Sequence, residues 1–235
     1  MSSDADTAPS GNIVRVAVID SGVFPDHPHV MGVDGGVAIT PAGEDADYID
    51  RIGHGTAVAG AIREKAPRAS LIAVKVFDRA LAGSVNTLVR AIDWAVDHDC
   101  HVINMSLGTS RAEHHARLRP VVDRALERGV IVVAAREDGG QQFLPGSLPG
   151  VLGVMVDWAC PRDQYRVETQ GEHVVCGASG YPREIPGVPP SRNLMGISFA
   201  VANMTGFVAR ALEAGIGDRR DIVGLLAVGS RSWID

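Results

Sequence analysis

Three residues of this 235-residue sequence have types and surroundings that suit nucleophilic chemistry. Asp20 ends an apolar run and precedes Ser-Gly, His54 stands in Gly-His-Gly-Thr, and Ser198 stands in Gly-Ile-Ser-Phe-Ala. A serine hydroxyl needs a base to take its proton, a histidine has a pKa suited to that work, and a carboxylate fixes the histidine tautomer. The ordered set predicts Ser198 as nucleophile, His54 as general base and then acid, and Asp20 as the group that orients His54.

The segments that carry these residues alternate between strand and helix patterns. We expect strands over residues 13–19, 71–77, 101–105, 130–135 and 151–156, and helices over residues 54–64, 112–128, 198–213 and 218–227, with one more after the N-cap Ser84. We expect loops over residues 21–46, 136–142 and 157–195, the first with room for one short strand and the last with a strand at 173–176. This alternation predicts an α/β fold with a mainly parallel sheet between two helix layers.

Bulk composition narrows the class of protein. With 46% hydrophobic and 21% charged residues, the chain can form one large domain over residues 13–235, after a disordered lead-in at 1–12. The net charge of -6 argues against nucleic acid or an anionic membrane as partner. No apolar run reaches the roughly 20 residues that span a bilayer.

The N-terminal residues and the cysteines favour a cytoplasmic protein. Residues 1–10 have neither the basic start nor the apolar stretch of a secretory signal. Cys100, Cys160 and Cys176 cannot all pair within one chain, so we interpret them as reduced thiols. A bridge between Cys160 and Cys176 remains an alternative.

Further motifs, in order along the chain, carry a resemblance to a known family. They are Ala-Val-Lys-Val at 73–76, Gly-Ser at 83–84, Ala-Ile-Asp-Trp-Ala at 91–95, Val-Ile-Asn-Met-Ser-Leu-Gly at 102–108 and Leu-Pro-Gly at 144–146. Together with the three motifs above, they make residues 13–213 resemble the subtilisin-like serine proteases, or subtilases. The resemblance implies a subtilisin-like fold, a peptide or protein substrate, hydrolysis through an acyl-enzyme, and no cofactor.

The resemblance also implies a peptide-binding cleft. The residues concerned are Ser106, Leu107 and Gly108 on one edge, Gly83 on the other, and Ala134 and Ala135 in the pocket for the residue before the scissile bond. Pairing of this kind has a physical basis, since an extended peptide adds to a sheet edge as a strand while pockets supply specificity.

The oxyanion hole departs from the family pattern. One donor is expected to be the main-chain N–H of Ser198, at the start of a helix. The family's second donor is an asparagine amide, but Glu137 matches that position in Ala-Arg-Glu-Asp-Gly. An ionised carboxylate only accepts hydrogen bonds, whereas a protonated one donates. We therefore expect weak activity at neutral pH and an acid-shifted optimum; Arg136, Gln141 or Gln142 are alternative donors.

Other polar clusters favour structural roles, and no metal site is expected. By the resemblance, a calcium-binding loop is deleted between Ile62 and Leu71. Asp45, Asp47 and Asp50 form an acidic group for which a solvated loop is favoured over a cation site. His114 and His115 are interpreted as surface residues of a helix.

These observations favour an intracellular endopeptidase that processes a precursor or leader peptide. Because of the acidic residue at the oxyanion position, a catalytically impaired protein that binds a peptide or protein partner is the main alternative. Acyl transfer to an amine is a third.

Overall fold

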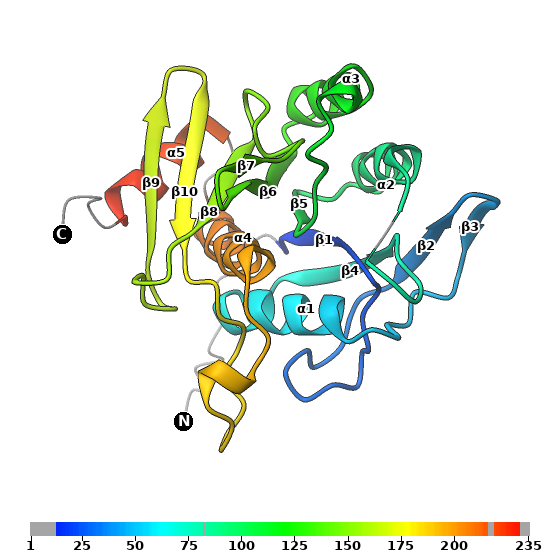
Figure 1. Cartoon of the computed structure of the whole chain (residues 1–235), viewed down its shortest axis with the longest axis horizontal. Coiled ribbons are helices and arrows are strands. Elements are labelled where there is room, and N and C mark those ends of the chain that lie inside the picture. Colours follow the sequence, from blue (N-terminus) through cyan, green and yellow to red (C-terminus); the bar gives the residue numbers. More distant parts are fainter. Residues whose placement is uncertain (1–12, 82, 216–218, 231–235) are drawn as a thin grey trace, which may run out of the picture.

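The computed structural model describes residues 13–81, 83–215 and 219–230, which build a sheet between two layers of helices (Figure 1). The sheet has the strand order β3-β2-β4-β1-β5-β6-β8-β10-β9, and β7 pairs with β6. From β2 to β10 every neighbouring pair along this path is parallel, and β3, β7 and β9 add as antiparallel partners. This confirms the predicted α/β class.

The described part of the chain contains ten strands and five α-helices. The strands are β1 Arg15–Asp20, β2 Gly36–Thr40, β3 Gly43–Asp45, β4 Ser70–Lys75, β5 Val102–Met105, β6 Ile131–Asp138, β7 Gln141–Gln142, β8 Leu152–Val156, β9 Tyr165–Gln170 and β10 His173–Ala178. The helices are α1 His54–Lys65, α2 Val85–Asp97, α3 His115–Glu127, α4 Ile197–Glu213 and α5 Arg219–Val228, with 3₁₀ turns at Ala112–His114 and Pro190–Arg192.

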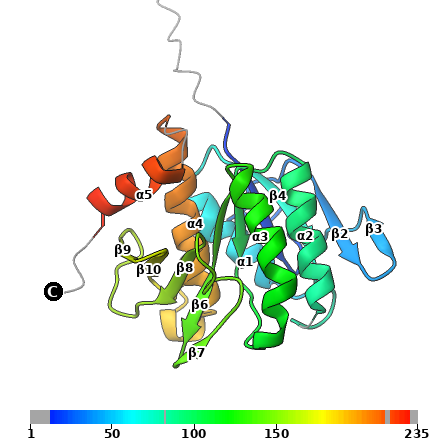
Figure 2. The ribbon, with the colours of Figure 1, turned by 90° about the horizontal axis from the view of Figure 1, so that it is seen from above.

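Helices cover both faces of the sheet, as Figure 2 shows from a second direction, and an apolar core lies between the sheet and each helix layer. Helices α1 and α4 contribute to one core, while α2 and α3 contribute to the other. Every residue of α4 from Phe199 to Ala209 is buried. Ser84 caps α2 as predicted, since its side chain accepts the N–H of Thr87.

Three segments expected to be mostly loop contain more strand than predicted. Residues 21–46 hold both β2 and β3, and residues 157–195 hold the β9–β10 hairpin. Residues 136–142 form the β6–β7 hairpin, in which Gly139 and Gly140 both have positive φ. That conformation suits the tight two-residue turn of a hairpin, which polar composition alone had concealed.

The strand ends place the candidate residues at one edge of the sheet. Asp20 is the last residue of β1, and Ser106 follows the end of the parallel neighbour β5. In open α/β sheets the carboxyl ends of parallel strands are where ligands bind.

None of the described helices is long and apolar enough to cross a membrane. Residues 1–12, which the sequence predicts to be a lead-in, lie outside the described residues, and the single-domain organisation stays a prediction.

Candidate active site

A groove of about 540 Å³ opens at this edge of the sheet. It brings together Asp20, His54 and Ser198 with four of the expected cleft residues, which are Gly83, Ser106, Leu107 and Gly108. The described residues that line it do not include Ala134, Ala135 or Glu137. Most of the residues singled out from the sequence therefore share one cavity.

Asp20 and His54 are in direct contact. The Oδ1 atom of Asp20 lies 2.7 Å from Nδ1 of His54, and it also accepts the N–H of Ser21 at 2.7 Å. Asp20 is fully buried, whereas His54 keeps 16% of its side chain exposed. A proton on Nδ1 held by this carboxylate leaves Nε2 as the basic nitrogen of the neutral ring.

The start of α1 is fixed by side chains that do not belong to the helix. The main-chain N–H of Gly55 donates to Oγ of Ser21 at 3.0 Å, and that of Thr56 donates to Asp50 at 2.9 Å. The Ser21 hydroxyl in turn donates to Asp50 at 2.9 Å. Because the first N–H groups of a helix lack partners within the helix, these two side chains act as its cap. They join the end of β1 to the residue that carries the imidazole.

Gly55 has a separate steric reason to be glycine. A Cβ atom at this position would lie 2.2 Å from the carbonyl oxygen of Gly22 and 3.1 Å from Cβ of Asp20. Any side chain here would push α1 away from β1 and lengthen the contact between Asp20 and His54.

The electrostatic surroundings raise the pKa of His54 above its ordinary value. Burial acts to lower this pKa and is the largest single effect. The hydrogen bond with Asp20, followed by the charges of Asp20 and Asp50, outweighs burial. Asp50 stays ionised, because hydrogen bonds from Thr56 and from main-chain N–H groups overcome its own burial and hold its pKa below the ordinary value. The imidazolium form of His54 is thus stabilised by two carboxylates.

Ser198 lies near the N-terminus of α4 and is tied to the end of β5. Its hydroxyl donates to the main-chain oxygen of Ser106 at 3.0 Å, and the Ser106 hydroxyl donates to the main-chain oxygen of Ser198 at 3.3 Å. Behind Ser106, the Asn104 amide donates to its Oγ, and Thr205 of α4 donates to Asn104, both at 2.9 Å. The sequence indicated Ser106 as a cleft residue but gave no sign of this buried connection.

Glu137 lies in the β6–β7 hairpin, half-buried and paired with Gln142. The β6–β8 ladder shifts register between Ala135 and Glu137, so Arg136 occupies an irregularity just before it. A strand residue next to such a bulge is redirected relative to its neighbours. The role of Glu137 at the oxyanion stays a prediction, as do the alternative roles of Arg136, Gln141 and Gln142.

Ala134 and Ala135 are both buried in β6, at 0% and 3% exposure. Ala135 packs closely against the segment that follows the hairpin, since a Cβ on Gly146 would lie only 2.0 Å from the Ala135 carbonyl oxygen. The pocket assignment of these alanines stays a prediction.

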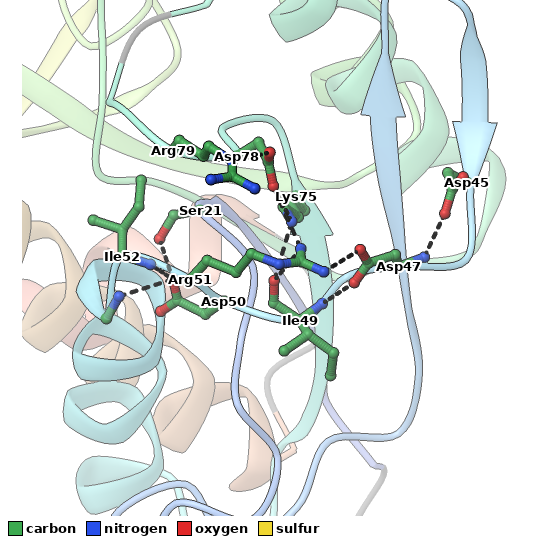
Figure 3. A network of polar contacts seen from close by, with 11 residues as sticks. Ser21, Asp45, Asp47, Ile49, Asp50, Arg51, Ile52, Lys75, Asp78 and Arg79 are labelled. Atoms are coloured by element: carbon green, nitrogen blue, oxygen red, sulfur yellow. Dashed lines mark hydrogen bonds and ion pairs between the residues drawn. The ribbon is translucent and has the colours of Figure 1, made fainter.

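The acidic residues before α1 are engaged in a structural network (Figure 3). Asp47 pairs with Arg51 at 2.6 Å, and Asp45 accepts the main-chain N–H of Asp47 at 2.8 Å. Asp50 receives the cap hydrogen bonds described above. No group of three or more histidine, cysteine or acidic residues suited to a metal ion occurs among the described residues.

The link from α1 to β4, where the resemblance implied a deleted calcium loop, consists of residues 66–69. The buried guanidinium of Arg63 holds this link by donating to the carbonyl oxygens of Pro67 and Ala69. It also donates to Val30 and Gly32 on the segment after β1. The Arg63 side chain therefore fastens two backbone segments to α1.

The cysteines are present as buried thiols, and the bridge between Cys160 and Cys176 is not formed. Burial raises the pKa of Cys176 to about 12 and that of Cys100 to about 11. Both groups therefore remain protonated and unreactive at ordinary pH.

Two ionisable residues of the groove were not predicted from the sequence. Arg111 and His114 both line it, although His114 was interpreted as a surface residue and Arg111 was not singled out. Arg111 precedes the 3₁₀ turn between β5 and α3 and His114 ends it, and in so short a turn helical periodicity does not reveal which side chains face a cavity.

Known proteins resemble this chain in sequence. The profile of the subtilase family matches residues 11–156, which include Asp20 and His54 and end before Ser198. Subtilisin E of Bacillus subtilis (strain 168) is 40% identical over 140 residues, covering 56% of this chain and 36% of its own length. The minor extracellular protease Epr of the same organism is 32% identical over 184 residues, covering 73% of this chain and 27% of its own length. The chain thus spans well under half of the length of these relatives.

Solved structures share the fold at low sequence identity. A cold-adapted subtilisin-like serine proteinase superposes with a TM-score of 0.71 at 22% identity, over 92% of this chain and 81% of that one. A lanthipeptide protease superposes with a TM-score of 0.69 at 20% identity, over 90% and 78%. The fold and the family profile together show that the chain belongs to the subtilase family.

Proposed function

We propose that this protein is a serine endopeptidase that hydrolyses peptide bonds through an acyl-enzyme. The observation that carries the proposal is the 2.7 Å contact between Asp20 and Nδ1 of His54 in the groove that Ser198 also lines. A carboxylate-oriented imidazole beside a serine at a helix N-terminus is the arrangement that activates a hydroxyl.

In the proposed reaction, Oγ of Ser198 bonds to the scissile carbonyl carbon while His54 takes the hydroxyl proton. His54 then protonates the leaving amine as the C–N bond breaks, and water releases the acyl group by the reverse sequence. Before attack, the Ser198 hydroxyl must rotate from the Ser106 oxygen towards His54. The negative charge on the carbonyl oxygen would be met by the Ser198 N–H, with Glu137 as the second group of the hole.

We further propose a dedicated role in trimming a precursor or leader peptide inside the cell. The three buried thiols support a reducing compartment. A lanthipeptide protease has the same fold, which is compatible with a processing role. Cell fractionation of the native host, with detection of the protein by antibody, tests the compartment.

Labelling with a fluorophosphonate probe tests the catalytic assignment. We expect the probe to modify Ser198, and the labelling to disappear in Ser198→Ala and His54→Ala. His115→Ala is the matched control, because His115 is exposed and is not among the residues lining the groove. Labelling that persists in His54→Ala would show that His54 does not activate the serine.

A second candidate is a protein that binds a peptide in the same groove without cleaving it. The observation that favours it is the Ser198 hydroxyl, which donates to the Ser106 carbonyl oxygen instead of to the imidazole. Peptide binding by a chain that the probe does not label would support this candidate.

A further inference from the structure

We propose that Arg111 and His114 recognise an acidic side chain of the peptide bound in the groove. This inference rests on the proposed function, because it names a feature of the substrate of that same site. It applies equally to a peptide that is cleaved and to one that is only held.

The charges that line the groove are the first argument. Of its fifteen described lining residues, the ionisable ones are Asp20, His54, Arg111 and His114. Asp20 is fully buried and hydrogen-bonded to His54, so its carboxylate cannot contact a bound peptide. The ionisable groups left to meet a ligand away from the reacting bond are the guanidinium of Arg111 and the imidazole of His114.

The Arg111 side chain forms no ion pair with any described acidic residue, and the residue is exposed. Glu113, the nearest acidic residue in the sequence, is not among the residues that line the groove. A guanidinium is always charged and presents several N–H donors in a plane, which matches a carboxylate in two-point contact.

The positions of both residues are fixed by Thr109. Its main chain forms a two-way bridge with Leu144, with N···O distances of 2.9 Å in each direction. Its Oγ1 accepts the main-chain N–H of Arg111 at 3.2 Å and lies 3.0 Å from Nδ1 of His114. Since Nδ1 is engaged by the threonine, Nε2 is the imidazole nitrogen left for a ligand. Arg111 and His114 therefore form a fixed basic site in the groove, although the net charge of the whole sequence is -6.

The remaining walls suit the stem of such a side chain. Val85 and Leu88 come from the start of α2, and Leu107 from the opposite edge. Apolar walls with an arginine head favour a glutamate, whose methylene groups pack while its carboxylate reaches the cation.

Binding to Ser198→Ala tests the proposal without requiring turnover. The probe is a fluorescent heptapeptide of otherwise neutral residues, in which glutamate, glutamine or lysine is placed at each position in turn. Fluorescence anisotropy measures the Kd of each peptide. We expect one position at which glutamate binds about 5- to 10-fold more tightly than glutamine, and lysine more weakly than either. The preference should shrink in high salt, because ions screen an exposed charge pair.

Charge reversal separates recognition from folding. In the Ser198→Ala background, Arg111→Glu should transfer the preference at that position from glutamate to lysine, which a damaged fold would not do. Arg128→Glu makes the same charge change at the exposed far end of α3 and should leave the preference intact. His114→Gln should reduce the preference without reversing it.

The outcomes of the two proposals are distinguishable. A protein that the fluorophosphonate labels but that binds the glutamate and glutamine peptides equally at all positions would overturn the acidic preference and leave the protease assignment standing. A glutamate preference that Arg111→Glu reverses, in a protein that the probe does not label, would uphold the preference and refute catalysis. A preference unaffected by Arg111→Glu would place the selectivity elsewhere and overturn the inference.

Discussion

Ser198 and Ser106 exchange hydrogen bonds, each hydroxyl donating to the main-chain carbonyl oxygen of the other. The pair lies 92 residues apart in sequence and joins the start of α4 to the end of β5. The main chain that carries the proposed nucleophile is thereby held to the edge along which the peptide is proposed to lie.

Ser106→Ala should lower kcat/KM about five-fold, because it removes one neutral hydrogen bond to the Ser198 main chain, of about 1 kcal/mol. It also deprives the Asn104 amide of its acceptor. Steady-state hydrolysis of a quenched fluorescent peptide measures the effect. Ser110→Ala, an exposed position that is not among the groove-lining residues, should be silent; equal losses in the two variants would contradict a specific role for Ser106.

Asp50→Asn should move the acid limb of the kcat/KM profile to lower pH. The charge of Asp50 helps to raise the pKa of His54. Without that charge the pKa of His54 falls, so the neutral imidazole that acts as base persists to lower pH.

Asp47→Asn is the matched control for this change. It removes a charge from the same loop, at a residue that pairs with Arg51 rather than with the start of α1. We expect its acid limb to coincide with that of the unmodified protein. Identical shifts in both variants would mean that overall charge, and not Asp50, acts on His54.

Glu137→Asn should raise the hydrolysis rate at neutral pH by about tenfold or more. An amide donates a hydrogen bond to the developing oxyanion at every pH, whereas an ionised carboxylate repels it. The rate advantage should diminish as the pH falls. Asp138→Asn makes the same charge change at the adjacent exposed residue and should have little effect. No gain from Glu137→Asn would show that the oxyanion assignment is wrong.

Arg63→Met should lower the free energy of unfolding by about 3 kcal/mol. The substitution keeps the apolar stem but leaves the carbonyl oxygens of Val30, Pro67 and Ala69 without their donor in a buried site. Urea unfolding measures the change. The comparison is Arg79→Met, because the Arg79 side chain is 87% exposed and its partner Asp78 is 61% exposed; this change should cost well under 1 kcal/mol.

Many of the strands and helices could be predicted from local sequence. The apolar run that forms β1 and the capping serine at the start of α2 are local signals, because a pattern of apolar side chains and a helix cap each involve only a few consecutive residues. The two-residue turn at Gly139 and Gly140 was also a local signal, but it was obscured by the polar residues around it. The β9–β10 hairpin lies in a segment whose prolines and glycines are typical of a loop. The parallel pairing of β10 with β8, which the structure shows, aligns this hairpin with the rest of the sheet.

Asp20, His54 and Ser198 could be identified from the sequence, because each lies in a short motif that a few neighbouring residues define. Their surroundings depend on the tertiary structure. The cap that Asp50 and Ser21 provide, and the path from Thr205 through Asn104 to Ser106, join segments that no short motif relates. Arg111 likewise lines the groove because of how the segment between β5 and α3 is placed, which the local sequence does not show. The physical reason is that hydrogen bonds and charges act over a few ångströms of space, and folding determines which distant residues come that close.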